Sequence, residues 1–298
     1  MRIMVSGATG LVGRALVRDL EDEGHRVVCL VRREARGNSE CAWDPERGTI
    51  DKDGLEGLDV VVHLAGESIA AGRWTVARKA RILDSRVQGT TLLSSALAAC
   101  ARKPRVLLSA SAIGYYGDRG DEVVNEESAP GTGFLAEVCQ AWESAADPAR
   151  AAGIRVVHPR IGIVLSRDGG ALPKMLPAFR LGLGGPFGAG QNYMSWVTLE
   201  DLVGILKFAI AHNDLSGPVN AVSPQPVTNL EFSRILAGAL RRPAWFAVPS
   251  PLVRAALGEM GQGLLLEGAR VVPRYLTEGG YLFRHRDLEG ALQTLLHS

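Results

Sequence analysis

The chain has 298 residues, of which 46% are hydrophobic, and its 33 basic and 32 acidic residues leave a formal net charge of +1. This length favours one large domain with a smaller second one, and the apolar content is sufficient for a sizeable core. The balanced charge, with neither a basic arm nor an acidic tail, gives no reason to expect nucleic acid or a membrane as a partner.

The four cysteines lie far apart in the sequence and form neither a CxxC pair nor a zinc-binding spacing. The first residues lead directly into a glycine-rich turn, without the charged and apolar regions of a leader peptide. The apolar runs are of strand length, far below the ~20 residues that span a bilayer. We therefore expect reduced thiols and a soluble cytoplasmic protein.

Predicted strands alternate with predicted helices through the first half of the chain. The strands are expected at residues 3–5, 26–31, 41–43, 59–64, 106–109 and 155–158. The helices are expected at residues 11–23, 74–101 and 133–152. This alternation predicts an α/β fold with a Rossmann-type doubly wound parallel sheet, whose strands are apolar because helices cover both faces.

The sequence changes character after about residue 167. Residues 182–190 are rich in glycine and proline and predict a loop, and the chain from residue 228 onward is mostly helical. We expect a Rossmann domain over residues 1–167, to which residues 196–222 return. Residues 168–298 then form a smaller, mainly helical C-terminal lobe on the substrate side.

A glycine-rich turn lies between the first predicted strand and the first predicted helix, with the spacing GxxGxxG. Glycines permit a tight turn, a close approach of the backbone to a pyrophosphate and close packing of the helix on the strand. The helix that follows directs free N–H groups at the phosphates. The alternative is a plain tight turn. The residues expected to contact a dinucleotide here are Gly7, Thr9, Gly10, Leu11 and Val12.

The end of the second predicted strand distinguishes NADP from NAD. An acidic residue there would bind the ribose hydroxyls, whereas a basic residue accommodates the 2′-phosphate. The sequence has Arg32 and Arg33 at this place. Arginine binds phosphate through charge-assisted hydrogen bonds, so the pair predicts NADP(H), with Arg32 as the stronger candidate. The alternative is that both are solvated loop residues.

The turn, the segment Val62–Gly66 and the strand end Ser109–Ser111 together resemble the extended short-chain dehydrogenase/reductase superfamily. Further segments narrow the resemblance to its atypical epimerase-family branch, whose members are also described as nucleoside-diphosphate-sugar epimerases or as cell-division-inhibitor-like. These segments are Arg73-Trp74, Asp84–Arg86, Ile113–Gly117, Phe134–Glu137, Arg180–Pro186, Ser195–Val197 and Gly217–Asn220. The resemblance covers nearly the whole chain, including the C-terminal segment specific to this branch.

The resemblance implies further cofactor contacts. Leu64 and Ala65 would border the adenosine and the pyrophosphate, and Val164 would approach the nicotinamide through its backbone. Arg81 and Arg86, on the long predicted helix, are additional candidates, although a helical arginine also serves as a surface or inter-helix ion-pair residue.

The resemblance also exposes a missing catalytic pair. Typical members of the superfamily use a serine with a Tyr-x-x-x-Lys pair, in which lysine and cofactor lower the tyrosine pKa from about 10. Aligning Glu143 with the glutamate of the family helix puts Leu135 at the tyrosine position and Cys139 at the lysine position. The usual acid and base are therefore absent.

Ser111 remains at the serine position, and we name Ser111 and Tyr115 as the candidate catalytic residues. Tyr116 and Glu67 are weaker candidates, and the structural alternatives are backbone hydrogen bonding for Ser111 and packing for the tyrosines. His63 ends a buried strand and is expected to be a satisfied core residue.

Three functions follow from these residues. The first is an NADPH-dependent reductase with a non-standard proton donor and an unknown small-molecule substrate. The second is a non-catalytic NADP(H)-binding protein with a regulatory or redox-sensing role. The third, a nucleotide-sugar epimerase, is disfavoured by Leu135 and Arg32. The sequence predicts no oligomeric state.

Overall fold

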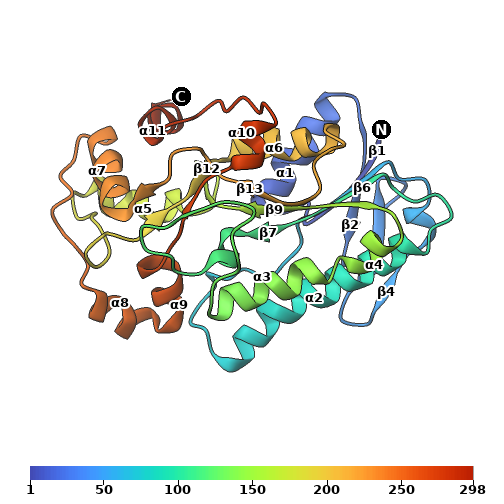
Figure 1. The fold of residues 1–298 in the computed structure, drawn as a ribbon, viewed down its shortest axis with the longest axis horizontal. Helices are drawn as coiled ribbons and strands as arrows, with labels where there is room; N and C mark the ends of the chain where they lie inside the picture. Colours follow the sequence, from blue (N-terminus) through green and yellow to red (C-terminus); the bar gives the residue numbers. More distant parts are fainter. Residues whose placement is uncertain (298) are drawn as a thin grey trace.

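The computed structural model describes residues 1–297 and has a central parallel sheet (Figure 1). Its strands run in the order β13-β9-β6-β5-β1-β2-β3-β4; all neighbours pair in parallel except β3 and β4, and β7 pairs with β9. The strands of this sheet are β1 (Arg2–Ser6), β2 (Arg26–Val31), β3 (Glu40–Asp44), β4 (Thr49–Ile50), β5 (Val60–His63), β6 (Val106–Ser109), β7 (Ser111–Ala112), β9 (Arg155–Ile161) and β13 (Gly217–Ala221). This order confirms the predicted Rossmann-type architecture.

Helices cover both faces of the sheet, as Figure 1 shows. Helices α1 (Leu11–Asp22) and α6 (Leu199–Ala211) contribute to the core on one face. The core on the other face includes residues of α2 (Val76–Ala98) and α4 (Asp147–Ala151). The central strands are fully buried, which explains why their sequences are continuous apolar runs.

The predicted helix over residues 133–152 is wrong in one respect, because the structure divides it. Helix α3 (Phe134–Ser144) ends before α4, and Pro148 lies in the first turn of α4. Proline lacks the N–H of the helical hydrogen bond and its ring clashes with the preceding turn, so it favours a break at this point and is tolerated in the first turn of α4.

The C-terminal lobe is mainly helical, as predicted. It contains α5 (Leu172–Arg180), α7 (Asn229–Ala239), α8 (Ser250–Leu257), α9 (Glu259–Gly261), α10 (Arg274–Glu278) and α11 (Leu288–His297). Three short strand pairs accompany them: β10 (Ile163–Leu165) with β12 (Trp196–Thr198), β11 (Tyr193–Met194) with β14 (Val227–Thr228), and β15 (Arg270–Val271) with β8 (Val123–Val124). The capping box of Thr228 and Glu231 fixes the start of α7.

One buried carboxylate ties the end of the chain to α6. Asp201 is 1% exposed, and its Oδ1 accepts a hydrogen bond from the backbone N–H of Arg284 at 2.8 Å. Its Oδ2 accepts one from the N–H of His285 at 3.0 Å, and the Tyr281 hydroxyl donates to the Asp201 carbonyl at 3.0 Å. The final segment is thus held on the helix that covers the central sheet.

Among residues 1–297, no helix has the length and apolar character needed to cross a membrane.

Candidate functional site

The glycine-rich turn leaves β1 and passes beside the end of β5, where the strand order reverses. Gly7 has a φ of +68°, and a Cβ there would lie 2.9 Å from the carbonyl carbon and oxygen of Leu64. A Cβ at Gly13 would lie 2.2 Å from the carbonyl oxygen of Gly7. Both positions therefore require glycine, for the turn itself and for the close packing of α1.

The N-terminus of α1 lies open next to this turn. Gly10 precedes the helix and offers no side-chain cap, and the first turn contains no acidic residue. The first backbone N–H groups of the helix, including those of Leu11 and Val12, therefore keep their donor capacity and the positive end of the helix dipole. Such a helix end binds phosphate. Thr9 is exposed in the same turn.

A buried chain of hydrogen bonds fixes the segment that faces the turn. The Ser6 hydroxyl accepts from the N–H groups of Leu64 at 3.0 Å and Ala65 at 3.2 Å, and lies 2.6 Å from Nδ1 of His63. His63 Nε2 lies 3.0 Å from the Thr90 hydroxyl. Since Ser6 already accepts twice, its proton is assigned to Nδ1, and Nε2–H donates to Thr90. Burial lowers the pKa of His63 to about 4, so the ring is neutral. Through Ser6 it holds the segment Leu64-Ala65 beside the glycine turn, and we call the turn and this segment the cradle.

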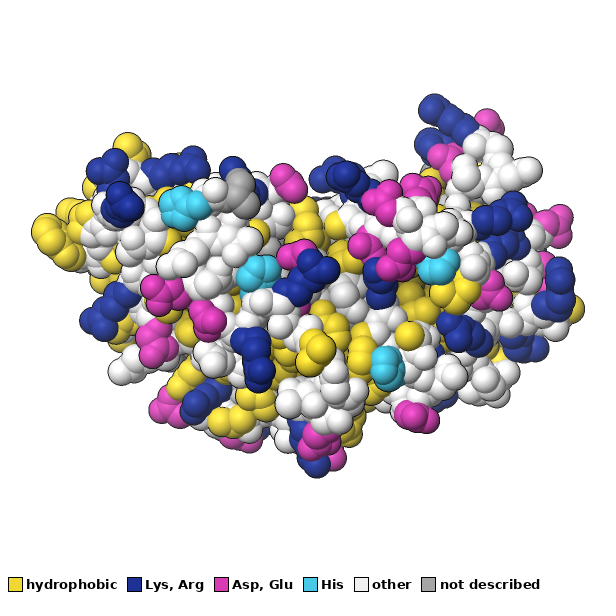
Figure 2. All heavy atoms as spheres, turned by 90° about the horizontal axis from the view of Figure 1, so that it is seen from above, with side chains coloured by type: hydrophobic (Ala, Val, Ile, Leu, Met, Phe, Trp, Pro, Cys, Tyr) yellow, Lys and Arg dark blue, Asp and Glu magenta, His cyan; other side chains and the backbone are white. Residues whose placement is uncertain are grey.

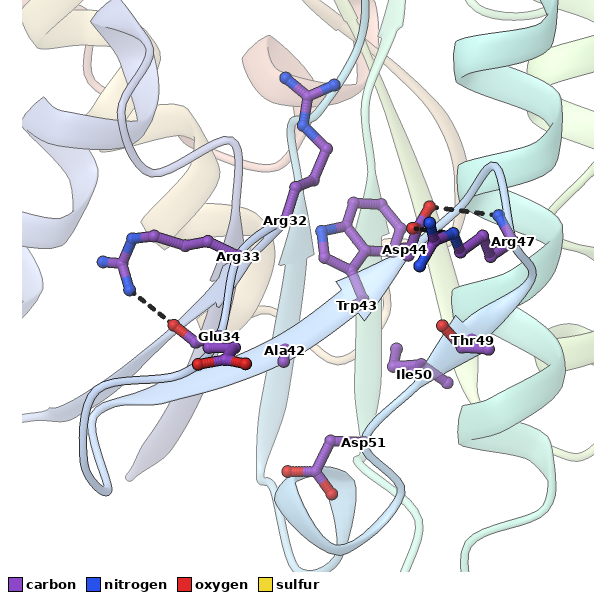
Figure 3. Close-up of a pocket in the computed structure, with 10 residues that line it drawn as sticks. All are labelled: Arg32, Arg33, Glu34, Ala42, Trp43, Asp44, Arg47, Thr49, Ile50 and Asp51. Carbon is purple, nitrogen blue, oxygen red and sulfur yellow. Dashed lines mark hydrogen bonds and ion pairs between the residues drawn. The ribbon is translucent and has the colours of Figure 1, made fainter.

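Two arginines diverge from the end of β2, as Figure 3 shows. Arg33 donates to both carboxylate oxygens of Glu40, at 2.5 and 2.7 Å, and to the carbonyl of Glu34. Arg32 is exposed and makes no hydrogen bond or ion pair with any residue from 1 to 297. Both line an open pocket of about 480 Å³, together with Trp43 and residues of the β3–β4 hairpin. Of these two arginines, Arg32 is thus the one whose N–H donors are free to bind an anion.

The serine position belongs to a buried ionic network. Ser111 is 2% exposed, and its hydroxyl donates to Oε1 of Glu143 at 2.7 Å. Arg160 donates to both oxygens of the same carboxylate, from Nε at 2.8 Å and Nη2 at 2.9 Å. This arrangement turns the Ser111 proton toward Glu143. The alternative of a hydrogen bond to backbone is therefore not what the structure shows, and the catalytic role of Ser111 stays a prediction.

The two tyrosines after Ser111 differ in their hydroxyl groups. The Tyr116 hydroxyl donates to Asn220 at 2.7 Å and accepts from Arg160 at 3.0 Å, and burial raises its pKa to about 12. Tyr115 is only partly buried, and its hydroxyl has no hydrogen-bond partner among residues 1–297. Its ring packs against the Arg160 guanidinium, 3.4 Å from the ring centre. Of the two tyrosines, only Tyr115 has a hydroxyl group that is free to bond a ligand.

Leu135 and Cys139 lie in α3 next to this loop. A Cβ at Gly114 would lie 3.1 Å from Cβ of Leu135 and 3.8 Å from Sγ of Cys139. The Cys139 thiol donates to the carbonyl of Ala112 at 3.6 Å, and burial raises its pKa to about 11. Leu135 and Cys139, at the positions of the usual tyrosine and lysine, therefore contact residues 111–116, which we call the serine loop. They carry an apolar side chain and a neutral thiol in place of the usual acid and base.

The remaining predicted cofactor residues have different surroundings. Arg86 is partly buried, donates to the Glu67 carbonyl at 3.0 Å and lies 4.8 Å from the Trp142 ring centre. Arg81 is exposed on α2. Val164 lies in β10, and side chains at the following Gly169 and Gly170 would contact Leu11. The structure thus brings the segment after Val164 to the glycine turn, while the cofactor contacts of Arg81 and Arg86 stay predictions.

Glu67 faces an arginine that the sequence had not singled out. Arg78 donates to Oε1 of Glu67 at 2.7 Å and to the carbonyl of Ser68. The Arg78 side chain is 11% exposed, so this ion pair anchors the loop between β5 and α2. Arg160 is another functional candidate that the sequence had not singled out. A signal for it was present, because it is a charged residue in a buried strand, and such a residue requires a buried partner.

The C-terminal lobe closes over this loop. Arg73 donates to the carbonyls of Ala255 and Ala256 in the last turn of α8, and Lys79 pairs with Glu259 at 2.8 Å. Trp74 packs edge-on against Phe134, with ring centres 5.1 Å apart. The contacts of Arg73 and Lys79 join the two lobes, and the Trp74–Phe134 pair packs beside them within the Rossmann domain.

A glycine-lined turn at the reversal point of a parallel sheet, followed by an uncapped helix, is the architecture of Rossmann-type dinucleotide-binding proteins. The model of the NAD dependent epimerase/dehydratase family matches residues 3–222, and a model for a domain of unknown function (DUF1731) matches residues 248–295. The chain belongs to the NAD dependent epimerase/dehydratase family, and the resemblance to its epimerase-family branch is confirmed.

Relatives and solved structures agree with this placement. The epimerase family protein Mb2239 of Mycobacterium bovis is 45% identical over 290 residues, 97% of this chain and 96% of the relative. The crystal structure of human epimerase family protein SDR39U1 (isoform 2) with NADPH superposes with a TM-score of 0.90 at 35% identity, covering 99% of both chains. A nucleoside-diphosphate sugar epimerase from Corynebacterium glutamicum gives a TM-score of 0.83 at 37% identity, with 99% of this chain and 58% of that chain covered.

Proposed function

We propose that the chain binds NADP(H) across the glycine turn and uses it for an oxidoreductase reaction on an unknown small molecule. The observation that carries the cofactor assignment is Arg32, an exposed guanidinium with no partner among residues 1–297, at the end of β2. The 2′-phosphate of NADP is the anion that this position accommodates. The human relative crystallised with NADPH supports the same assignment.

The cradle fits the rest of the cofactor. Side chains are excluded at Gly7 and Gly13, so backbone can approach a pyrophosphate, and the free N–H groups of α1 face it. Leu64 and Ala65 form the opposite wall. The pyrophosphate would be held by Gly7, Thr9, Gly10, Leu11 and Val12.

The test compares two neighbouring arginines. Arg32→Ala should weaken NADPH binding by about 1.5–3 kcal/mol, the size of a hydrogen bond to a charged group, and leave NADH binding unchanged. Arg33→Ala is the matched control, because Arg33 already pairs with Glu40. Equal losses for NADPH and NADH in Arg32→Ala, measured by calorimetry, would remove the role given to Arg32.

For the reaction, NADPH supplies a hydride when bound, and this chain must supply a proton. Leu135 cannot do so, and the Ser111 hydroxyl is committed to Glu143. Tyr115 has a phenol without a partner among residues 1–297, on the loop beside Ser111, and Arg160 holds its ring. We assign the proton to Tyr115, while Ser111, Glu143 and Arg160 position it.

The matched variants are Tyr115→Phe and Tyr116→Phe. In a screen of carbonyl compounds for NADPH oxidation, Tyr115→Phe should lose about 10²-fold or more in kcat, the usual contribution of a general acid. Tyr116→Phe should lose stability, because it removes hydrogen bonds to Asn220 and Arg160. An unchanged rate in Tyr115→Phe would overturn the assignment.

The side chains of α3 at the usual acid and base positions favour a second, non-catalytic function. With Leu135 and a neutral Cys139 at the two usual positions, the chain could bind NADP(H) without turnover, in a regulatory or redox-sensing role. Tight NADPH binding without oxidation of any carbonyl compound, with cofactor-dependent capture of a partner, would favour this function. A nucleotide-sugar epimerase is the third candidate, and conversion of a nucleotide sugar into its C4 epimer, with the C4 hydrogen retained and not exchanged with solvent, would support it.

A further inference from the structure

The C-terminal lobe carries exposed apolar side chains on two adjacent loops. We call them the apolar patch, and they are Leu181 (75% exposed), Leu183 (57%), Trp245 (84%) and Phe246 (55%). The loops lie together, because a Cβ at Gly182 would contact Pro243 at 3.5 Å and one at Gly185 would collide with the backbone of Phe246. Large apolar side chains this exposed and this close together mark an interaction surface.

Only basic charges accompany the apolar patch along these segments. Residues 169–199 and 232–258 contain no Asp or Glu. Arg180, Arg241 and Arg242 are exposed and form no ion pair with any residue from 1 to 297. Figure 2 shows hydrophobic and basic side chains at the end of the molecule where Figure 1 places α5 and α7, with acidic side chains further along the same face. The net charge of +1 conceals this local excess.

Arg241 adds a backbone observation. Its φ is +55°, the one positive value at a residue other than glycine between residues 1 and 297. It follows the end of α7, where the N–H of Arg242 bonds to the carbonyl of Ala237 at 2.9 Å, and glycine is the residue that usually takes this left-handed position. An arginine is held there at the expense of strain, which points to a use for its charge.

From this combination we propose that the apolar patch docks on an anionic lipid surface. Tryptophan and phenylalanine enter the boundary between headgroups and acyl chains, while arginines contact the lipid phosphates. Two copies of the chain facing each other through this patch would oppose like charges, which disfavours self-association. Docking is peripheral, since the described residues contain no spanning helix. The overall charge balance had led us to expect no membrane partner, and the local arrangement is the reason to propose one.

The fluorescence of Trp245 can report on docking of the apolar patch. The other four tryptophans, at positions 43, 74, 142 and 196, are at most 9% exposed, whereas Trp245 is 84% exposed. Titrating the full chain with vesicles of phosphatidylcholine containing 30 mol% phosphatidylglycerol should shift the emission to the blue and protect it from iodide quenching. Pure phosphatidylcholine vesicles should have little effect. Raising the salt concentration should weaken binding to the anionic vesicles, because it screens the arginines.

Three variants separate the contributions. Arg241→Gly removes the charge and suits the positive φ, so it should fold well and bind anionic vesicles on the order of fivefold more weakly. Trp245→Ser should reduce co-sedimentation at least as much. Leu282→Ser is the matched control, because Leu282 is 87% exposed outside the patch, and it should bind like the wild type.

The outcomes are distinct. Absence of binding to anionic vesicles at low salt, or equal binding by Trp245→Ser and wild type, overturns the proposal. Dimers in sedimentation velocity that Trp245→Ser disperses, without vesicle binding, would assign the patch to contact between copies and also overturn it. NADPH affinity, measured in parallel, tests the cofactor site separately and is expected to be the same in all three variants.

Discussion

The guanidinium carbon of Arg160 lies 3.4 Å from the centre of the Tyr115 ring. The same guanidinium forms a two-pronged ion pair with Glu143, whose carboxylate also accepts the Ser111 proton. One cation therefore fixes the serine loop and the tyrosine ring together. It comes from β9, which pairs with β6 on one side and β13 on the other, so a buried strand of the sheet sets the geometry of the loop.

Removing Arg160 should be costly. The side chains of Arg160 and Glu143 are 3% and 14% exposed, and Arg160→Leu leaves a buried carboxylate without its partner. We expect a loss of about 3–5 kcal/mol in the free energy of unfolding by urea denaturation. The double variant Arg160→Leu with Glu143→Leu should recover part of this loss, because neither charge remains. A single variant that loses under ~1 kcal/mol would contradict the account.

Two helical glycines should respond to alanine in opposite directions. Gly13→Ala places a Cβ against the Gly7 carbonyl, so it should lower both thermal stability and NADPH affinity. Gly238, exposed in α7, has nothing within 4 Å of its Cβ position. Gly238→Ala should raise stability by roughly 0.5–1 kcal/mol through helix propensity and leave cofactor binding unchanged. Equal effects of the two substitutions would refute the close packing inferred at the turn.

Stability should fall as the pH drops from about 6.5 to 4. Burial lowers the pKa of His63 and of His158 from 6.5 to about 4. In this window the unfolded chain binds protons that the folded chain does not, so the free energy of unfolding decreases as the pH falls, by roughly 3 kcal/mol for each histidine. Below the folded pKa both states are protonated and this contribution becomes constant. His63→Gln should flatten the slope of stability against pH, and an unchanged slope would show that His63 titrates normally.

The contact between the lobes should be separable from the fold of the sheet. Arg73→Ala removes the donors to the last carbonyls of α8, so amide hydrogen exchange should accelerate in α8 and α9 while β1 and β5 stay protected. Arg254→Ala is the control, because this arginine lies on α8 itself and bonds to Gln262. Similar exchange in the two variants would indicate that Arg73 does not hold the lobes together.

Much of the sheet could be predicted from sequence, because each buried strand is a short apolar run between turn residues. The glycine turn was predictable for a comparable reason: Gly7 and Gly13 each fill a requirement that no other residue meets. Helix ends were harder, and α3 and α4 are divided by Pro148 inside a pattern that otherwise reads as continuous. Short strands such as β8 and β15 pair only through tertiary contacts, which leave little periodicity in the sequence.

The residues of the candidate site could be named from the sequence, but the hydrogen bonds and ion pairs among them could not. Arg32 and Arg33 are equivalent in the sequence, and only the pairing of Arg33 with Glu40 separates them. Tyr115 and Tyr116 are likewise adjacent, and long-range contacts with Asn220 and Arg160 decide which phenol is free. The partners that distinguish Tyr116 from Tyr115 lie 44 and 104 residues away along the chain.

The carboxylate of Asp201 has a consequence for how the chain folds and can be divided. A fragment ending at residue 222, where the match to the epimerase/dehydratase model ends, would keep α6 but lose the donors of Tyr281, Arg284 and His285. Thr198 would still donate to the Asp201 carboxylate, but this charge on the helix that covers the central sheet would have lost most of its hydrogen bonds. We expect the two lobes to unfold in one transition, and the half that contains the central sheet to require the last residues of the chain for its own stability.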